Sequence, residues 1–309
     1  MRWKGRKQSS NVEDRRGTTV RGGGGGPVAG GAIGSLLFAL FRRGSGKTKL
    51  ILIVGVIAAC FMFKINPISL FMSTPGGGSS QVVSQKDYQP TAAEQEMFEY
   101  LKTLKGDNET IWAKIMAAEG LTYRPAKMVV YTQRTSTPGG IADAQMGPFY
   151  LPANETIYID PSFFSELEQR FKAKGDFAQA YVIAHEVGHH IQKLLGLTDK
   201  VHGQQGRISK TEYNRLSVRL ELQADFLAGV FAHHGQEKFN FLENGDIEEA
   251  MRCAEAIGDD RIQQHSHGHV QPDLFTHGTS EQRKRWFMRG YQSGRIRDGN
   301  TFDVPYNEL

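Results

Sequence analysis

The sequence of 309 residues predicts a helix-rich α+β domain with a small β-sheet, preceded by one transmembrane helix. Two observations predict the domain. Several long stretches between residues 91 and 309 have apolar residues at helical spacing, and the β-rich stretches among them are few and short. A third observation predicts the membrane helix, because one long apolar run lies ahead of these stretches.

Composition excludes several classes of protein. A mean hydropathy of −0.42 excludes a polytopic membrane protein. Two cysteines exclude a disulfide-dense scaffold and a metal site with four cysteine ligands. The net charge of +4 hides an asymmetry, because residues 1–49 contain 11 Lys or Arg against 2 Asp or Glu, whereas the rest of the chain is acidic overall.

The first predicted elements are a tail and an anchor. We expect residues 1–49 to form a flexible, basic tail, because five consecutive glycines disfavour a packed backbone. Residues 50–71 are then the transmembrane anchor. A cleaved signal peptide is the less favoured alternative, since its apolar run would lie nearer to residue 1. A weaker apolar stretch at 28–41 leaves a second span open.

Charge predicts the topology of this anchor. The positive-inside rule places the basic tail in the cytosol and the acidic body outside it. This predicts a single-pass membrane protein with a cytosolic N-terminus and a domain in a periplasm-like space outside the cytosol. Beside a membrane span, basic residues indicate topology and contact with anionic lipid more than nucleic-acid binding. Residues 72–90, which contain Pro75 and a run of glycines, are predicted to be a linker.

The body is predicted to extend over residues 91–309, with its elements in a mixed order. Two helices, at 91–104 and 109–119, come before the β-rich stretches. Those stretches lie at 127–133, 147–151 and 155–160. The remaining helices are predicted at 161–172, 176–195, 212–233, 246–264 and 280–291.

The helix over 176–195 carries the sequence His-Glu-Val-Gly-His-His, which starts at His185. Four residues advance a helix by about 400°, so His185 and His189 lie on one face, where two imidazoles can bind one zinc ion. Glu186 lies about 100° around the helix, within reach of a water molecule at the metal. Gly188 lowers helix stability by about 1 kcal/mol relative to alanine, which favours a close neighbour at that position.

Glu221 and Asp225 share a face of the apolar helix over 212–233. Buried carboxylates are unfavourable unless they are paired or bind a metal. We therefore expect Glu221 to be the third zinc ligand and Asp225 to accept the remaining N–H of a ligating imidazole. A water activated by zinc, with Glu186 as general base, would then hydrolyse a peptide bond. Manganese and cobalt are alternative metals.

Five segments of the chain resemble the bacterial family of putative neutral zinc metallopeptidases. They are the first 17 residues, the GPFY sequence at 147–150, the HEVGHH helix, the ELQAD sequence from Glu221, and residues 276–287. The resemblance spans nearly the whole chain. It implies a membrane-anchored, zincin-like peptidase with a gluzincin-type third ligand. Cysteines expected in relatives near 147–150 are missing here, so the disulfide that the resemblance implies is not expected.

His277 is a second candidate catalytic residue. It precedes the helix over 280–291, and related membrane zincins carry a histidine in a comparable late motif, which implies oxyanion support. Alternatively, His277 only packs at the turn before that helix. Arg283, on the helix itself, either pairs with Asp225 or Glu221 or faces solvent.

The other histidines are predicted not to be ligands of the main site. His190 points away from the ligand face of its helix. His233 and His234 lie near a helix C-terminus, where cations suit the helix dipole. The histidines between 265 and 269 lie in a polar stretch that we expect to be solvent-exposed. Tyr150 is predicted to belong either to an edge strand that aligns a peptide or to an ordinary small sheet.

The sequence therefore predicts a membrane-anchored zinc metalloendopeptidase that acts on a peptide or protein and binds no nucleic acid. Two alternatives use the same residues. One is a zinc-stabilised binding module without activity, and the other is a zinc amidase that acts on cell-wall peptides. Glu186 separates the peptidase from the binding module, because only catalysis needs a general base.

Overall fold

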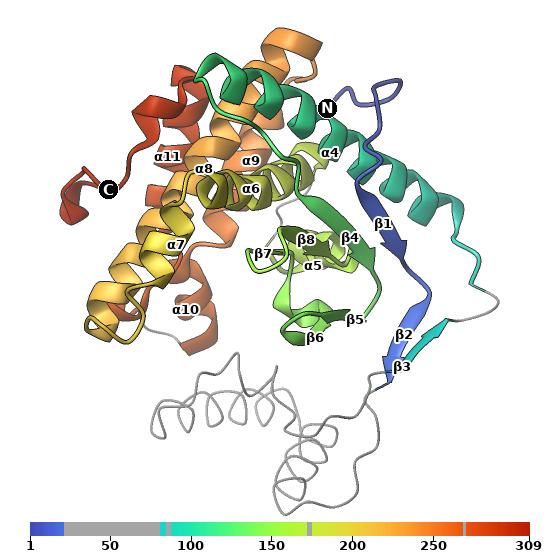
Figure 1. The fold of residues 1–309 in the computed structure, drawn as a ribbon, viewed down its shortest axis with the longest axis horizontal. Helices are drawn as coiled ribbons and strands as arrows, with labels where there is room; N and C mark the ends of the chain where they lie inside the picture. Colours follow the sequence, from blue (N-terminus) through green and yellow to red (C-terminus); the bar gives the residue numbers. More distant parts are fainter. Residues whose placement is uncertain (22–80, 85–87, 172–174, 268–269) are drawn as a thin grey trace, which may run out of the picture. The chain divides into compact units, whose positions relative to one another are not determined.

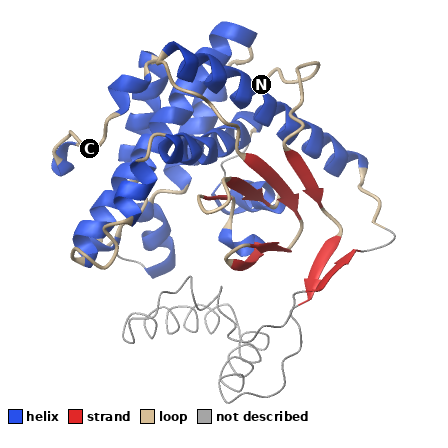
Figure 2. Ribbon diagram, viewed as in Figure 1, coloured by secondary structure: helices blue, strands red, loops and turns tan. Residues whose placement is uncertain are grey.

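The computed structural model describes residues 1–21, 81–84, 88–171, 175–267 and 270–309. It is a helix-rich α+β protein with small sheets, which confirms the predicted class (Figures 1 and 2). The described residues form two compact units. The larger contains Met1–Arg16, Gln89–Tyr131 and Ala144–Leu309, and the smaller takes its residues from Gly17–Tyr88 and Thr132–Asp143.

The helices belong to the larger unit. They are α4 (Ala92–Ala118), α5 (Ser162–Phe171), α6 (Asp176–Leu194), α7 (Leu197–His202), α8 (Lys210–Phe239), α9 (Asp246–Ala256), α10 (Asp259–His267) and α11 (Ser280–Ser293). Helix α8 packs against both α6 and α11, and its apolar side chains form much of the core. This packing holds the helix with the HEVGHH sequence directly against the helix that carries Glu221.

A four-stranded sheet completes the larger unit. Its order is β1 (Val12–Arg15), β4 (Lys127–Tyr131), β8 (Thr156–Ile159) and β7 (Phe149–Leu151). The first three strands are parallel, and β7 runs antiparallel to β8 at the edge. Helix α6 contacts β7, so this edge strand lies beside the HEVGHH helix.

The smaller unit consists of two antiparallel pairs. Strand β2 (Thr18–Arg21) pairs with β3 (Gln81–Ser84), and β5 (Arg134–Thr137) pairs with β6 (Gly140–Asp143). None of these strands was predicted, since each is only four residues long and lacks a run of apolar residues.

The two predicted helices at 91–104 and 109–119 are one continuous helix, α4. The sequence Lys-Gly-Asp-Asn at its centre suggested a break, but all four residues are buried. A Cβ atom on Gly106 would lie 2.4 Å from the carbonyl oxygen of Lys7, and Arg6 forms a 2.8 Å ion pair with Asp107. The N-terminal residues therefore pack across the middle of α4 and stabilise the helix where its local propensity is weakest.

The helix predicted over 246–264 is divided into α9 and α10. The division lies at Gly258, where a Cβ atom would come within 2.5 Å of the backbone nitrogen of Ser280. The chain turns there to bring Asp259 beside the loop before α11, a long-range contact that local periodicity does not reveal.

The prediction of a flexible tail over 1–49 is wrong for its beginning. Strand β1 pairs in parallel with β4, and Met1 is buried, with its amino group 2.8 Å from Asp176. The basic side chains are neutralised locally, as in the pair of Arg16 with Asp14. Met1–Arg16 and the residues after Gln89 thus form one folded unit.

This arrangement corrects the predicted single-pass topology. One membrane crossing between residues 16 and 89 would place two parts of the same folded unit on opposite sides of a bilayer. The predicted anchor at 50–71 lies outside the described residues, as does the weaker apolar stretch at 28–41. Within the described part of the chain, no helix combines the length and the apolar character that a membrane span needs.

Candidate metal centre

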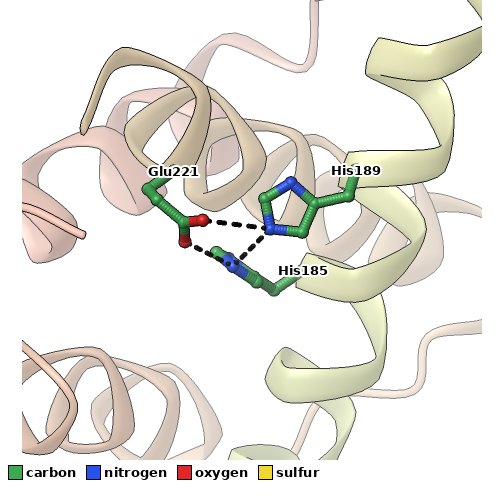
Figure 3. Close-up of side chains that lie close together, drawn as sticks. All are labelled: His185, His189 and Glu221. Atoms are coloured by element: carbon green, nitrogen blue, oxygen red, sulfur yellow. Dashed lines mark hydrogen bonds and ion pairs between the residues drawn. The ribbon is translucent and has the colours of Figure 1, made fainter. Parts of the chain in front are cut away.

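Helix α6 brings His185 and His189 together on one face. Their ring nitrogens Nε2 lie 3.2 Å apart, and the two rings meet edge to face (Figure 3). Gly188, between them, faces α8, and a Cβ atom there would lie 3.0 Å from the carbonyl oxygen of Ala224. The close neighbour predicted for this glycine is therefore the backbone of α8.

Helix α8 adds the carboxylate of Glu221 to the two imidazoles. Its oxygens lie 3.2 Å from Nε2 of His185 and 3.5 Å from Nε2 of His189 (Figure 3). Three ligands at about 2.0–2.1 Å from a tetrahedral zinc ion stand roughly 3.3–3.4 Å apart, the edge of that tetrahedron. The three donors thus have the spacing of a zinc site, and together they form a group that could hold a metal ion.

Hydrogen bonds on the far side of each ring fix the tautomers. Nδ1 of His185 lies 2.8 Å from Asp225, and Nδ1 of His189 lies 3.0 Å from the side-chain oxygen of Gln192. Because both partners accept, each Nδ1 carries the proton and each Nε2 of a neutral ring presents a lone pair to Glu221. Oriented imidazoles of this kind are typical of metal sites.

A buried ion pair supports this arrangement from behind. Arg283, on α11, donates two hydrogen bonds to Asp225, at 2.8 and 2.9 Å, and both side chains are almost completely buried. The hydroxyl of Tyr181 also donates to Asp225. Of the alternatives that the sequence left open for Arg283, the structure therefore selects pairing with Asp225.

Comparison with known proteins agrees with this geometry. A model of the family described as "Putative neutral zinc metallopeptidase" matches residues 1–302. The chain belongs to this family. It is 46% identical over 302 residues to "Uncharacterized protein YpfJ" of Escherichia coli K12, which covers 98% of this chain and 99% of the relative. It is also 35% identical over 227 residues to "Uncharacterized protein Rv2575" of Mycobacterium tuberculosis H37Rv, which covers 69% of this chain and 74% of the relative. No solved structure matches.

The metal of this metallopeptidase family is zinc. The two imidazoles and the carboxylate of the group described above fit a zinc ion. Burial lowers the pKa of His185, but Asp225 and Glu221 outweigh it and raise that pKa to about 10. Burial raises the pKa of Glu221, but His189, His277 and His185 outweigh it and hold the carboxylate ionised. In the absence of metal the group therefore attracts a positive charge between its donors.

Glu186 lies on the same helix, beside the three donors, and is buried. Burial raises its pKa to about 7, and the backbone N–H of Tyr150 on β7 donates to its carboxylate. Burial of a carboxyl group strengthens it as a base, which is the property that a general base needs.

His277 lies in the loop before α11 with a half-exposed side chain, and its positive charge lowers the pKa of Glu221. Its Nδ1 lies 3.1 Å from Asp259, whose other oxygen accepts the backbone N–H groups of His277 and its two neighbours. The sequence did not predict the roles of Asp259 and Gln192. Each orients the imidazole ring of another residue, and no local sequence pattern indicates such a role.

Of the remaining histidines, His190 is buried away from the ligand face. Its Nε2 donates to the carbonyl oxygen of Arg124, and its Nδ1 accepts from Tyr150. Side chains between 265 and 269 lie outside the described part of the chain. His233 and His234 meet Glu237 at the far end of α8.

Proposed function

We propose that this protein is a zinc-dependent endopeptidase in which His185, His189 and Glu221 hold the metal and Glu186 is the general base. The observation that carries the proposal is the convergence of the three donors beside a buried carboxylate of raised pKa. Zinc, when bound at such donors, polarises a carbonyl group and acidifies a water molecule. Manganese and cobalt are the alternative metals for the same donors.

Glu186 is suited to move the proton. Burial raises its pKa above that of a free carboxyl group, which strengthens it as a base, and the Tyr150 N–H fixes the orientation of its carboxylate. The carboxylate would take a proton from the attacking water and deliver it to the leaving amine, which is the work of a general base that then acts as an acid.

His277 is suited to stabilise developing negative charge on the scissile carbonyl oxygen. Burial lowers its pKa, but Glu221 and Asp259 outweigh it, so the net shift is upward. With Nδ1 held by Asp259, Nε2 is the nitrogen left to donate to substrate. A donor aimed at an oxyanion typically contributes about 10²–10³ in rate.

Strand β7 is suited to align the substrate. It is the edge of the four-stranded sheet and contacts the HEVGHH helix. An extended peptide can add to such an edge through backbone hydrogen bonds, with its scissile bond carried toward Glu186. The alternative, that β7 only completes the sheet, predicts that substrate length beyond the scissile bond has no effect on KM.

The proposal is tested with the Glu186→Gln variant. We expect the variant to retain zinc, because Glu186 is not a metal ligand. Its rate of peptide hydrolysis should fall about 10²–10⁴-fold. Glu168→Gln, an exposed change on α5, is the matched control and should leave both unchanged. Wild-type protein that binds zinc but cleaves no member of a peptide library would establish the binding-module alternative, and cleavage of cell-wall peptides alone would establish the amidase.

We also infer that any membrane anchor between β2 and β3 returns the chain to the side from which it left. What supports this is the shared fold of Met1–Arg16 with the residues after Gln89. The two apolar stretches, 28–41 and 50–71, enclose a connector with four basic and no acidic residues. The positive-inside rule then places the connector in the cytosol and the metallopeptidase unit outside it.

Cysteine labelling tests this topology. In a background in which both native cysteines are replaced, Ser10→Cys should react with a membrane-impermeant maleimide added to spheroplasts, whereas Ser45→Cys should react only after lysis. Labelling of neither residue before lysis would place the folded unit in the cytosol. Labelling of both would show that the connector is not cytosolic.

A further inference from the structure

His233, His234 and Glu237 gather near the C-terminal end of α8. They are 12 or more residues beyond Glu221 on the same helix, which places them about 18 Å from the metal centre described above. Helical position alone suggests that two cations complement the helix dipole there. The contacts of the two imidazole rings support a different interpretation.

Each ring has one nitrogen committed to a backbone carbonyl. Nδ1 of His233 lies 2.7 Å from the carbonyl oxygen of Tyr291, and Nε2 of His234 lies 2.8 Å from that of Gly294. A carbonyl oxygen only accepts, so these two nitrogens carry the ring protons. The hydrogen bonds satisfy carbonyl groups at the end of α11, where the helix leaves them without partners.

The other two ring nitrogens face the same carboxylate. Nε2 of His233 lies 3.4 Å and Nδ1 of His234 lies 3.1 Å from the oxygens of Glu237. In neutral rings both nitrogens present lone pairs, so three acceptors meet with no hydrogen between them. A cation between the three atoms would make the contact favourable.

One divalent ion would meet all three donors at once, because their ligand atoms lie within 4.8 Å of one another. Two imidazoles with one carboxylate is a donor set that zinc prefers.

Two features of the surroundings concern this cluster. Gly294 adopts a left-handed conformation, and a Cβ atom there would lie 2.5 Å from Nε2 of His233. Any side chain at position 294 would therefore collide with Nε2 of His233, one of the three proposed metal ligands. A cavity of 530 Å³ lies beside the cluster, and His234 and Glu237 line it together with other acidic and basic side chains.

We propose that His233, His234 and Glu237 form a second zinc site, which ties the end of α8 to the end of α11. Its role is structural, because its ligand rings hold the carbonyl groups that close α11, the helix that also carries Arg283. The proposal does not depend on the peptidase activity, since neither its residues nor its cavity belongs to the first centre.

The test measures zinc per chain in untagged, full-length protein dialysed against micromolar free zinc. His233→Asn and His234→Gln are the sharpest variants, because each amide can still donate to the carbonyl group while the metal-binding nitrogen is lost. We expect two zinc ions in the wild type, one in either variant, one in Glu221→Gln, and none in Glu221→Gln combined with His233→Asn. Glu248→Gln, an exposed change on α9, should retain both.

A second readout uses stability. In the Glu221→Gln background, added zinc should raise Tm, and the rise should disappear when His233→Asn is added. The proposal is overturned if the wild type holds a single zinc ion that Glu221→Gln removes, or if both amide variants keep the wild-type zinc content. If an amide variant loses helical circular dichroism, zinc content is measured instead in Glu237→Gln, whose side chain is 59% exposed, and two zinc ions retained there would overturn the proposal.

Discussion

The pair formed by Asp225 and Arg283 allows a quantitative prediction. In Asp225→Asn the side chain keeps its shape and loses its charge. Arg283 would keep the carbonyl oxygen of Ile257 and the hydroxyl of Tyr181 as partners, and neither carries the negative charge that a buried guanidinium needs. The variant therefore leaves an uncompensated charge in the core between α6, α8 and α11.

The expected magnitude follows from the burial of this pair. Its side chains are 0% and 2% exposed, so solvent screens the lost interaction very little. Removing one partner of such a pair reduces the free energy of unfolding by about 3–5 kcal/mol. In the double variant Asp225→Asn with Arg283→Met, the loss in free energy of unfolding should be about 2 kcal/mol smaller than the sum of the losses in the two single variants.

Chemical denaturation of the metal-free proteins measures these differences without a contribution from zinc binding. Lys284→Met is the matched control on the same helix, because Lys284 pairs with the exposed Glu281 at 3.1 Å and its loss should cost less than about 1 kcal/mol. If the two single variants each lose less than about 1 kcal/mol, or if their effects simply add in the double variant, the pair does not act as a buried unit.

Three further changes have defined outcomes. Gln192→Leu removes the acceptor that orients His189, so zinc affinity in a chelator competition should fall about 10–100-fold; unchanged affinity would contradict this role. Gly290→Ala would place a Cβ atom 2.0 Å from the carbonyl oxygen of Phe226, so its Tm should fall by more than that of Gly188→Ala, whose nearest contact is 3.0 Å. Burial raises the pKa of Asp107 to about 7 and outweighs the opposing effect of Arg6, so the folded state binds the extra proton and the contribution of Asp107 to stability falls as pH rises from about 4 to 7. As pH rises over this range, the free energy of unfolding of Asp107→Asn should increase relative to that of the wild type by up to about 1.4 kcal/mol per pH unit. If the two proteins show parallel plots of unfolding free energy against pH, the raised pKa of Asp107 is refuted.

What the sequence could predict was local. Helical period places His185, His189 and Glu221 on their faces, and the structure brings these three together. The low helix propensity of Gly188 predicted a close neighbour, which α8 supplies.

What it could not predict depends on partners distant in the chain. The pairing of β1 with β4 joins segments more than a hundred residues apart, and the basic, glycine-rich composition around it indicated a loose tail. The sequence indicated only C-terminal cations at His233 and His234, because the carbonyl groups that orient their rings lie some sixty residues away.

The charges at the first centre lead to a last prediction. Glu186, Glu221 and Asp225 can carry three negative charges and Arg283 one positive charge, so a divalent ion makes the sum zero with both histidine ligands neutral. Without metal the same sum is reached by protons, which is consistent with pKa values of about 10 for His185 and about 7 for Glu186. Zinc binding should therefore release about one proton from His185 and, below pH 7, a second from Glu186. Calorimetry in buffers of different ionisation enthalpy counts these protons. In Glu186→Gln the count below pH 7 should fall by about one, and an unchanged count would mean that Glu186 is not the group that neutralises the metal-free site.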